Sequence, residues 1–211
     1  DEEQIRWWKN LIIRGMGQFF YENKIDWRAP DFLRILTPGV GEETPGVASH
    51  QFNDRYLVPF AGGRDSIVTL EDLKKQKKGS PVGLRPREIS LFTVNPITKI
   101  QKAVKVSGIK KQIIVRRIVD KKLLELNKKG YLNGHTPFTA LLSFISVLCA
   151  VLFDYKNIAF SNEKSANEGN VRYLGKTINH QWAKSYEFEK MFKGYVKKYL
   201  VRDINYFSYL R

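Results

Sequence analysis

Four short apolar segments, the first two of which end in turn-forming residues, alternate with helix-forming segments through the middle of the chain. The predicted strands are residues 56–60, 89–94, 112–116 and 157–161. The predicted helices are residues 5–20, 66–73, 99–106, 120–129, 137–153 and 183–200. Strands that alternate with helices form parallel sheets, because a parallel connection needs a crossover long enough to hold a helix. We therefore predict an α/β fold in which helices cover both faces of a parallel sheet.

Composition bounds the size of this fold. The 211 residues are 43% hydrophobic and 27% charged, which excludes a disordered or fibrous chain and allows a buried core. We expect an N-terminal segment over residues 1–50, a core over 51–165, and a substrate-site loop with a C-terminal helix over 166–211. The aromatic run at residues 205–211 is typical of the interior of a domain, so we expect the natural chain to continue.

The chain is strongly basic. Its net charge of +15, from 36 Lys and Arg against 21 Asp and Glu, favours a polyanionic partner such as a nucleotide, a nucleotide-sugar, a nucleic acid or a membrane surface. The single cysteine, Cys149, excludes a disulfide within the chain and favours a reducing compartment. No signal peptide is recognisable, so we expect a cytoplasmic protein. We expect Cys149, His50 and His135 to have structural roles only.

Residues 137–153 carry no charge, and their length is at the lower limit for crossing a bilayer. Polar residues interrupt the stretch, and predicted strands lie on both sides of it in the sequence. A helix buried between a sheet and its neighbours has the same pattern. We therefore predict a buried helix and no membrane span.

The sequence AGGRDS, residues 61–66, joins the first predicted strand to the next helix. Gly62 and Gly63 allow the backbone to turn tightly and to approach a ligand, and the helix N-terminus favours an anion. Ser66 suits a helix cap or a phosphate contact, and Asp65 suits Mg²⁺. The alternative is a tight strand-to-helix turn in which an Asp caps the helix.

This loop resembles the SGGxDS pyrophosphate loop of the ATP pyrophosphatase superfamily, whose members split ATP into AMP and diphosphate. Ala61 replaces the first serine of that pattern, and Arg64 occupies its variable position. The resemblance implies a Rossmann-like PP-loop (adenine nucleotide alpha hydrolase-like) domain with helical additions, and ATP and Mg²⁺ as cofactors. It also implies an adenine contact beyond the second strand, at Thr93 and Asn95.

Two polar clusters follow the fourth predicted strand, at residues 161–170 and 179–185. They are dense in amides, carboxylates and hydroxyls, which is typical of a site for a substrate rich in the same groups. A solvated surface loop is the alternative.

The sequences AGGRDS, SNEKSANEGN and NHQWAKSYEFE, in this order and spacing, resemble the family of UDP-N-acetylmuramoyl-L-alanyl-L-glutamate epimerases. The resemblance runs from about residue 51 to the end of the chain. It implies ATP-dependent epimerisation of the terminal L-glutamate of the UDP-muramoyl dipeptide, through an acyl-adenylate and with release of AMP and diphosphate, in peptidoglycan precursor synthesis. The implied partner is this anionic small molecule; a nucleic acid is not expected.

The resemblance also implies roles for individual residues. Inversion at Cα needs proton donors or acceptors on both faces, and the candidates are Glu163, Glu168, His180 and Lys184. Candidates for orienting substrate amides and hydroxyls are Asn162, Ser165, Asn167, Asn170, Asn179, Gln181 and Ser185. ATP candidates are Ala61, Gly62, Gly63, Arg64, Asp65, Ser66, Thr93 and Asn95, with Asp65 also the candidate for the metal.

Two other classes of function remain open from the sequence. The first is a tRNA-modifying enzyme of the same superfamily that adenylates a base, which the positive charge favours. The second is a nucleic-acid-binding module without enzymatic activity, which would bind in a salt-sensitive manner without cleaving ATP. The carboxylates of the first polar cluster argue against the module, because they repel phosphate.

Overall fold

The fold was determined as a computed structural model that describes residues 1–36, 47, 49–78 and 88–211. The chain forms two compact units, each built from separate stretches of sequence. The hairpin unit comprises Asp1–Gly46, Val119–Ala140 and Ser165–Phe188. The sheet unit comprises Val47–Ile118, Leu141–Lys164 and Glu189–Arg211. Two of these boundaries lie close to the divisions expected at residues 50 and 165. Residues 119–140 belong to the hairpin unit, and residues 189–211 belong to the sheet unit.

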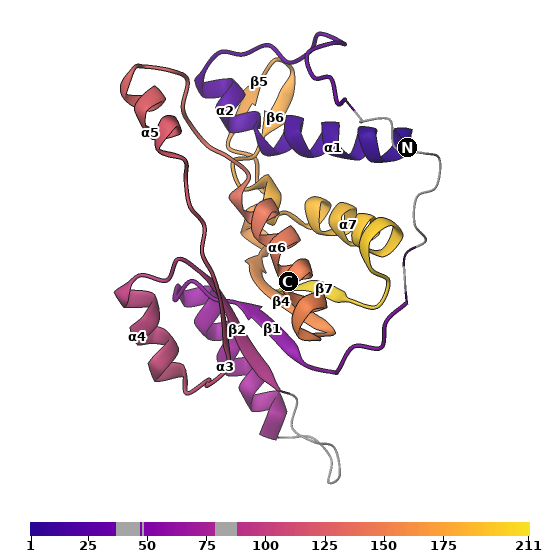
Figure 1. Cartoon of the computed structure of the whole chain (residues 1–211). Coiled ribbons are helices and arrows are strands. Elements are labelled where there is room, and N and C mark those ends of the chain that lie inside the picture. Colours follow the sequence, from indigo (N-terminus) through magenta and orange to yellow (C-terminus); the bar gives the residue numbers. More distant parts are fainter. Residues whose placement is uncertain (37–46, 48, 79–87) are drawn as a thin grey trace. The chain divides into compact units, whose positions relative to one another are not determined.

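The sheet unit contains a five-stranded parallel sheet in the order β3-β2-β1-β4-β7 (Figure 1). Its strands are β1 (Tyr56–Pro59), β2 (Ile89–Val94), β3 (Gln112–Val115), β4 (Asn157–Glu163) and β7 (Asn205–Leu210). Tyr56 pairs with Ile89 on one side and with Asn157 on the other, which sets the register of the central strands. The strand order reverses between β1 and β4, so the predicted parallel α/β fold is confirmed and its switch point lies between these two strands.

Side chains alternate between the two faces of this sheet, because successive residues of a strand point to opposite sides. On one face Val58 and Phe60 pack with Leu70 and Leu73 of α3 (Arg64–Lys78). The helix α4 (Thr98–Ser107) contributes Ile100, Ala103 and Val104 to the same cluster.

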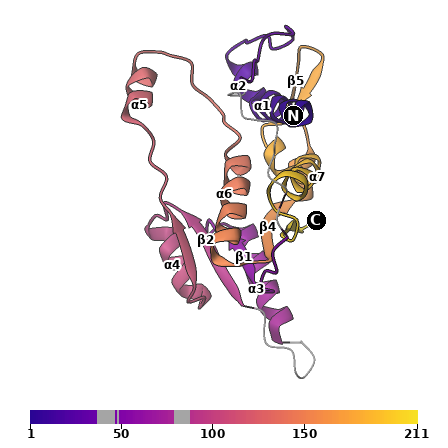
Figure 2. The same cartoon turned by 45° about the vertical axis from the view of Figure 1, so that its right-hand side comes forward.

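The opposite face is organised around Tyr206 of β7, which is 2% exposed. Its hydroxyl lies 2.9 Å from the Ser143 Oγ of α6 (Phe138–Phe153), and its ring contacts Phe192 of α7 (Tyr186–Tyr195) at 4.8 Å. Phe144 and Phe192 are in edge-to-face contact at 5.0 Å, so α6 and α7 pack against each other in the sheet unit (Figure 2). Helices therefore cover both faces of the sheet, as the alternation of strands and helices predicted.

The helix α6 is less buried than the sequence predicted. Ser143, Ser146 and Ala150 are fully buried, whereas Leu148 and Leu152 are 57% and 65% exposed. The prediction of a buried helix therefore holds for the face rich in small residues and not for the face that carries Leu148 and Leu152. Among the described residues, no helix is long and apolar enough to cross a membrane.

The hairpin unit begins with α1 (Glu2–Gly15), which the Asp1 side chain caps by accepting from the Gln4 backbone N–H at 2.7 Å. The prediction of a single helix over residues 5–20 is wrong, because α1 ends before Met16 and a second helix, α2 (Gly17–Glu22), follows. The other helix of this unit is α5 (Lys121–Lys128).

A two-stranded antiparallel hairpin, β5 (Val171–Tyr173) and β6 (Lys176–Ile178), completes the hairpin unit. Leu174 and Gly175 both have positive φ, +47° and +79°, which is the conformation of a tight two-residue hairpin turn. The sequence analysis did not predict this hairpin, because its strands are short and polar on one side. Ile178 packs with Phe20 and Trp27 to form the core of the unit.

The C-terminal region also differs from the prediction of one helix over residues 183–200. It contains the short 3-10 helix η2 (Trp182–Lys184), then α7, then a π-helical turn η3 (Val196–Leu200). Ser185 separates η2 from α7, where its Oγ accepts a hydrogen bond from the Phe188 N–H at 3.1 Å. Another short 3-10 helix, η1 (Lys164–Asn167), follows β4.

Candidate functional site

The glycine loop, residues 61–66, leaves the sheet at the carboxyl end of β1 and enters α3. Gly62 has a φ of +68°, and a Cβ at this position would lie 3.4 Å from the Ala103 Cβ of α4. A side chain would therefore be strained by the backbone and crowded by α4. The glycine at this position is a requirement of the turn itself.

Gly63 differs from Gly62 in both respects. Its φ is not positive, and a Cβ built on it would meet nothing within 4 Å. Its carbonyl accepts hydrogen bonds from the Ile67 N–H at 3.1 Å and from the Ser66 Oγ at 2.8 Å, so it stands at the start of α3. The loop thus leaves open space next to a helix N-terminus, where backbone N–H groups and the helix dipole favour an anion.

Ser66 and Asp65 have different exposures. Ser66 is 8% exposed and lies within α3, where its hydroxyl donates to the Gly63 carbonyl at 2.8 Å, whereas a capping hydroxyl would accept a backbone N–H. The Asp65 side chain is 42% exposed, and its Oδ1 lies 3.7 Å from the Nε of the largely exposed Arg64. Among the residues that the structure describes, no group of three or more His, Cys, Asp or Glu could hold a metal ion. One accessible carboxylate fits a Mg²⁺ ion that takes most of its other ligands from phosphate oxygens and water.

The side chains of the predicted adenine contacts are engaged within the sheet. Thr93 is 2% exposed, and its Oγ1 accepts a hydrogen bond from the Gln112 Nε2 at 2.9 Å. Asn95 follows β2 with a φ of +42° and bridges to Arg117, donating to its carbonyl at 2.6 Å and accepting from its N–H at 2.9 Å. These two residues join the ends of β2 and β3, so an adenine there would contact backbone.

Asn162 and Glu163 end β4, the strand next to β1. Asn162 is buried and donates to the Ser208 Oγ at 3.1 Å, whereas Glu163 is exposed. The pairing of β4 with β7 is irregular between Phe160 and Glu163, which is common where a strand ends next to a site. Because carboxyl ends of parallel strands share one edge, Glu163 and the glycine loop lie at the edge where open α/β sheets bind ligands.

The amides of the hairpin unit hold its polar segment in shape. Asn170 donates to the Gln18 Oε1 at 2.9 Å and accepts from the His180 N–H at 2.9 Å. Asn179 donates to the Ala166 carbonyl and accepts from the Gln181 N–H, both at 2.8 Å. These bonds connect the two polar clusters that the sequence separates.

Asn167 and Ser185 lie at the start of α7. The Asn167 Oδ1 accepts from the Tyr186 N–H at 2.7 Å, one residue after Ser185. Ser165 and Glu168 are exposed on the preceding segment, and the Glu168 N–H donates to the Ser165 carbonyl at 3.1 Å. The roles of all these residues toward a substrate stay a prediction.

His180 lies beside His135, with ring centroids 6.4 Å apart, and its Nε2 is 3.4 Å from the Gln181 Nε2. Burial lowers the pKa of His135, and the nearby positive charges of His180 and Lys184 lower it further, against the opposing effect of Glu22. The sequence analysis gave His135 no role, since no local pattern connects it with the residues around His180. The structure adds it to the acid–base candidates.

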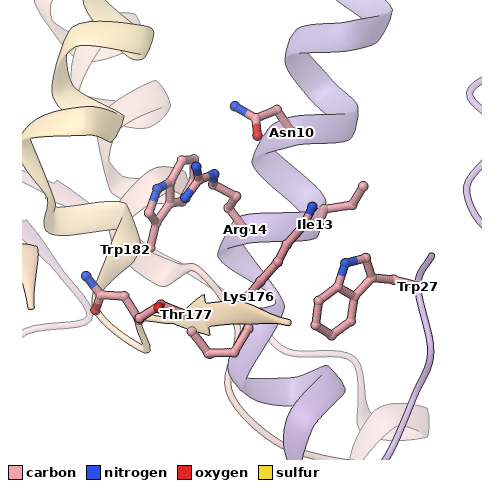
Figure 3. A pocket seen from close by; sticks show the side chains of 9 residues that line it. Asn10, Ile13, Arg14, Trp27, Lys176, Thr177 and Trp182 are labelled. Carbon is pink, nitrogen blue, oxygen red and sulfur yellow. The ribbon is translucent and has the colours of Figure 1, made fainter. Parts of the chain in front are cut away.

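The four acid–base candidates divide between the units. Glu163 belongs to the sheet unit, and Glu168, His180 and Lys184 belong to the hairpin unit. His180 and Lys184 are both close enough to His135 to shift its pKa, so the structure brings these three together. Within the hairpin unit there is also a pocket of about 510 Å³ between α1, β6 and Trp182, and Asn179 is the one predicted site residue that lines it (Figure 3).

An open parallel sheet with a glycine turn after β1, next to its switch point, defines the class of open α/β proteins. Residues 1–209 match the family model described as the MurL N-terminal domain. The chain therefore belongs to the MurL N-terminal domain family.

Three relatives carry the name UDP-N-acetyl-alpha-D-muramoyl-L-alanyl-L-glutamate epimerase. The Salinispora tropica protein is 38% identical over 95% of this chain and 41% of its own length. The Micromonospora protein is 35% identical over 95% of this chain and 42% of its own length, and the Xanthomonas oryzae protein is 29% identical over 96% and 42%. The chain thus spans about two fifths of the length of these curated relatives.

Among solved structures, the chain is similar to a predicted subunit of tRNA methyltransferase from Methanocaldococcus jannaschii. The similarity covers 75% of this chain and 68% of that one, with a TM-score of 0.39 and 19% sequence identity.

Proposed function

We propose that this chain is the nucleotide-binding part of an enzyme that epimerises the terminal L-glutamate of UDP-N-acetylmuramoyl-L-alanyl-L-glutamate, with ATP as the activating substrate. The observation that carries the proposal is the open position at Gly63, held by the left-handed turn at Gly62 at the start of α3. The names of the relatives support the substrate and the isomerase class. The class of reaction explains why a nucleotide site is needed.

Removing the Cα proton of glutamate is difficult because a free carboxylate lies beside it, and a carbanion there would place two negative charges together. In the proposed reaction an oxygen of the α-carboxylate of glutamate attacks the α-phosphorus of ATP, and diphosphate leaves. In the resulting acyl-adenylate the α-carboxyl group has lost its negative charge, so its carbonyl can accept the electron pair when the Cα proton is removed. Return of a proton to the opposite face inverts the centre, and hydrolysis releases AMP and the D-glutamate product.

The glycine loop would bind the phosphates of ATP. Gly63 allows phosphate oxygens to approach the backbone N–H groups at the start of α3, and the accessible Asp65 would hold Mg²⁺. The ion would neutralise phosphate charge as the diphosphate leaves. Arg64 is 88% exposed beside Asp65 and would add positive charge at the same edge. Phosphate binding by this loop is the role that its resemblance to the pyrophosphate loop implies.

Proton transfer would fall to residues with accessible polar atoms. Glu163, Glu168, His180 and Lys184 remain the proposed donors and acceptors, and His135 joins them as a neighbour of His180. The lowered pKa of His135 favours its neutral form at neutral pH, which suits a proton acceptor. The segment fixed by Asn170 and Asn179 would orient the substrate's amides and hydroxyls.

The nucleotide site is tested by ATP binding to the chain, measured by calorimetry with Mg²⁺. Gly63→Ala places a methyl group in the open space and should weaken ATP binding by about tenfold or more, because it crowds the phosphates. Gly194→Ala is the matched control, since a Cβ at Gly194 also meets nothing within 4 Å. Equal ATP affinity of the unsubstituted chain and both variants would contradict the loop assignment.

The reaction is tested by incubation with UDP-N-acetylmuramoyl-L-alanyl-L-glutamate, ATP and Mg²⁺ in D₂O. We expect AMP together with solvent deuterium at the Cα of D-glutamate, measured by chromatography and mass spectrometry. Asp65→Ala should abolish AMP formation. AMP without deuterium would indicate adenylation of another substrate, and tRNA would then be the next acceptor to test.

A further inference from the structure

We propose that the pocket of the hairpin unit binds the uridine diphosphate end of the substrate. This site is separate from the glycine loop, which is proposed to bind ATP. The pocket has a volume of about 510 Å³, within the usual range of small-molecule sites. Its lining includes Asn10, Ile13 and Arg14 of α1, Lys176 of β6, Trp27 and Trp182. The identity of the base rests on the proposed function, whereas the chemistry of the ligand follows from the lining.

The pocket presents positive charge. Arg14 and Lys176 are the charged residues of its lining, and no carboxylate belongs to the lining. Among the described residues, no Asp or Glu lies within ion-pair distance of Lys176, so the described part of the chain leaves its charge unpaired. A phosphate group placed here would supply the missing negative charge.

Arg14 and Trp182 are held in place by one residue outside the lining. Glu187 accepts a hydrogen bond from the Trp182 Nε1 at 3.1 Å through one oxygen and pairs with the Arg14 Nη2 at 2.9 Å through the other. The Arg14 guanidinium lies 6.0 Å from the centre of the Trp182 ring. This arrangement fixes a cation and an aromatic ring next to each other before any ligand binds, which reduces the entropic cost of binding.

Trp27 adds a hydrogen-bond donor that has no partner within the described ranges of the chain. Its side chain is 5% exposed, and its Nε1 is buried without a hydrogen bond. An indole N–H only donates, and leaving it unpaired costs about 1–3 kcal/mol. The ring is packed by Phe20 at 5.5 Å and Tyr173 at 5.3 Å, and its nitrogen edge turns toward Ile13 in the pocket (Figure 3). A carbonyl oxygen of a bound ligand could supply the acceptor that the Trp27 Nε1–H lacks.

A uridine diphosphate meets these requirements together. Its phosphates match the charge of Lys176, and Arg14, which is already paired with Glu187, belongs to the same lining. Its base carbonyls are acceptors for the Trp27 N–H, and its planar ring suits a pocket with aromatic walls. Figure 3 shows Arg14 and Trp182 on one side of α1 and Trp27 on the other, with Lys176 reaching along the helix between them. We therefore place the diphosphate at Arg14 and Lys176 and the uracil at Trp27.

The experiment is titration of the chain with UDP, followed by calorimetry and by tryptophan fluorescence. Lys176→Gln removes an exposed charge without disturbing the fold and should weaken UDP binding by about tenfold or more. Trp27→Phe keeps an aromatic ring but removes the N–H, and it should also weaken binding. Lys121→Gln, an exposed cation of α5 outside the pocket, is the matched control and should bind UDP as the unsubstituted chain does. Circular dichroism checks that Trp27→Phe is folded.

The proposal would be overturned by no binding of UDP at millimolar concentration, by equal binding of UDP to Lys176→Gln and the unsubstituted chain, or by inorganic diphosphate that binds as tightly as UDP. The last would assign the pocket to phosphate alone. ATP that competes fully for the same sites would show that the pocket does not distinguish the uridine nucleotide, which also overturns the proposal. UDP binding needs neither ATP cleavage nor turnover, so its failure is separate from a failure of the epimerase reaction.

Discussion

Gly62 lies so close to Ala103 of α4 that a Cβ added to the glycine would be 3.4 Å from the Ala103 Cβ. The glycine loop and α4 therefore approach each other closely at this point. The neighbouring Gly63 has no such contact. Two adjacent glycines thus have separate reasons to be glycine: the first is needed for the turn, and the second leaves space for a ligand.

This difference predicts that alanine substitutions at the two glycines have different effects on stability. Gly62→Ala should lower the free energy of unfolding by about 1–2 kcal/mol, because an L-residue in the left-handed region is strained. Gly63→Ala should change stability little while it weakens ATP binding. Urea denaturation of both variants checks this, and a Gly63→Ala that unfolds as readily as Gly62→Ala would contradict it.

The buried pair of Ser143 and Tyr206 predicts a specific cost of removing one hydroxyl. The two oxygens are 2.9 Å apart, and both side chains are almost fully buried. Tyr206→Phe should therefore destabilise the chain by about 1–2 kcal/mol, since the hydrogen bond is lost while the ring packing remains. Burial also raises the pKa of Tyr206 well above that of a free tyrosine. In a pH titration followed by tyrosinate absorbance, Tyr206→Phe should leave the ionisation of the native protein below pH 11 unchanged.

Glu189 should be more important to stability than a surface acid. Its side chain is 5% exposed and pairs with Lys193 at 2.8 Å and Arg211 at 3.6 Å. Glu189→Gln keeps the size but removes a largely buried carboxylate that faces both Lys193 and Arg211, which should cost about 3 kcal/mol. Lys193→Gln is the control, because the more exposed Lys193 should cost less than 1 kcal/mol or so. Equal midpoints of denaturation for both variants would contradict this ranking.

His135 predicts a pH dependence of stability. Its pKa in the folded chain is lowered from 6.5, chiefly by burial and then by His180, so the unfolded chain takes up the proton first as the pH falls. The stability that neutral His135 contributes is fully present above pH 6.5 and is lost as the pH falls through the folded pKa. His135→Asn should therefore reduce the loss of stability between about pH 7 and pH 5, measured by thermal unfolding. An unchanged slope in the variant would show that His135 does not titrate differently on folding.

Local sequence patterns were sufficient for much of the sheet unit. The strands β1, β2 and β3 and the helix α4 have bounds within one or two residues of the prediction, and so does α5 in the hairpin unit. Each is short and has apolar residues on the expected period. The glycine loop was also predictable, since a run of two glycines between a strand and a helix allows few backbone conformations.

The parts that were not predicted depend on contacts between distant residues. Residues 205–210 become the edge strand β7 only because β4 is available to pair with them. The break at Met16 and the exposed face of α6 likewise follow from packing. His135 joins His180 through the fold of the hairpin unit, and the partners of Asn170 and Asn179 come from segments outside their own motifs.

The sequence by itself determined the alternation of strands and helices, the glycine turn after β1 and the basic charge, because each depends on residues that are neighbours along the chain. Only the tertiary structure decided the strand order, with its switch point between β1 and β4, and the pocket that places Trp27 and Lys176 beside α1. The spacing of apolar residues along the sequence indicates which face of a helix or strand is apolar. It does not indicate which other element covers that face, because hydrophobic packing is not directional and many partners would bury the same area.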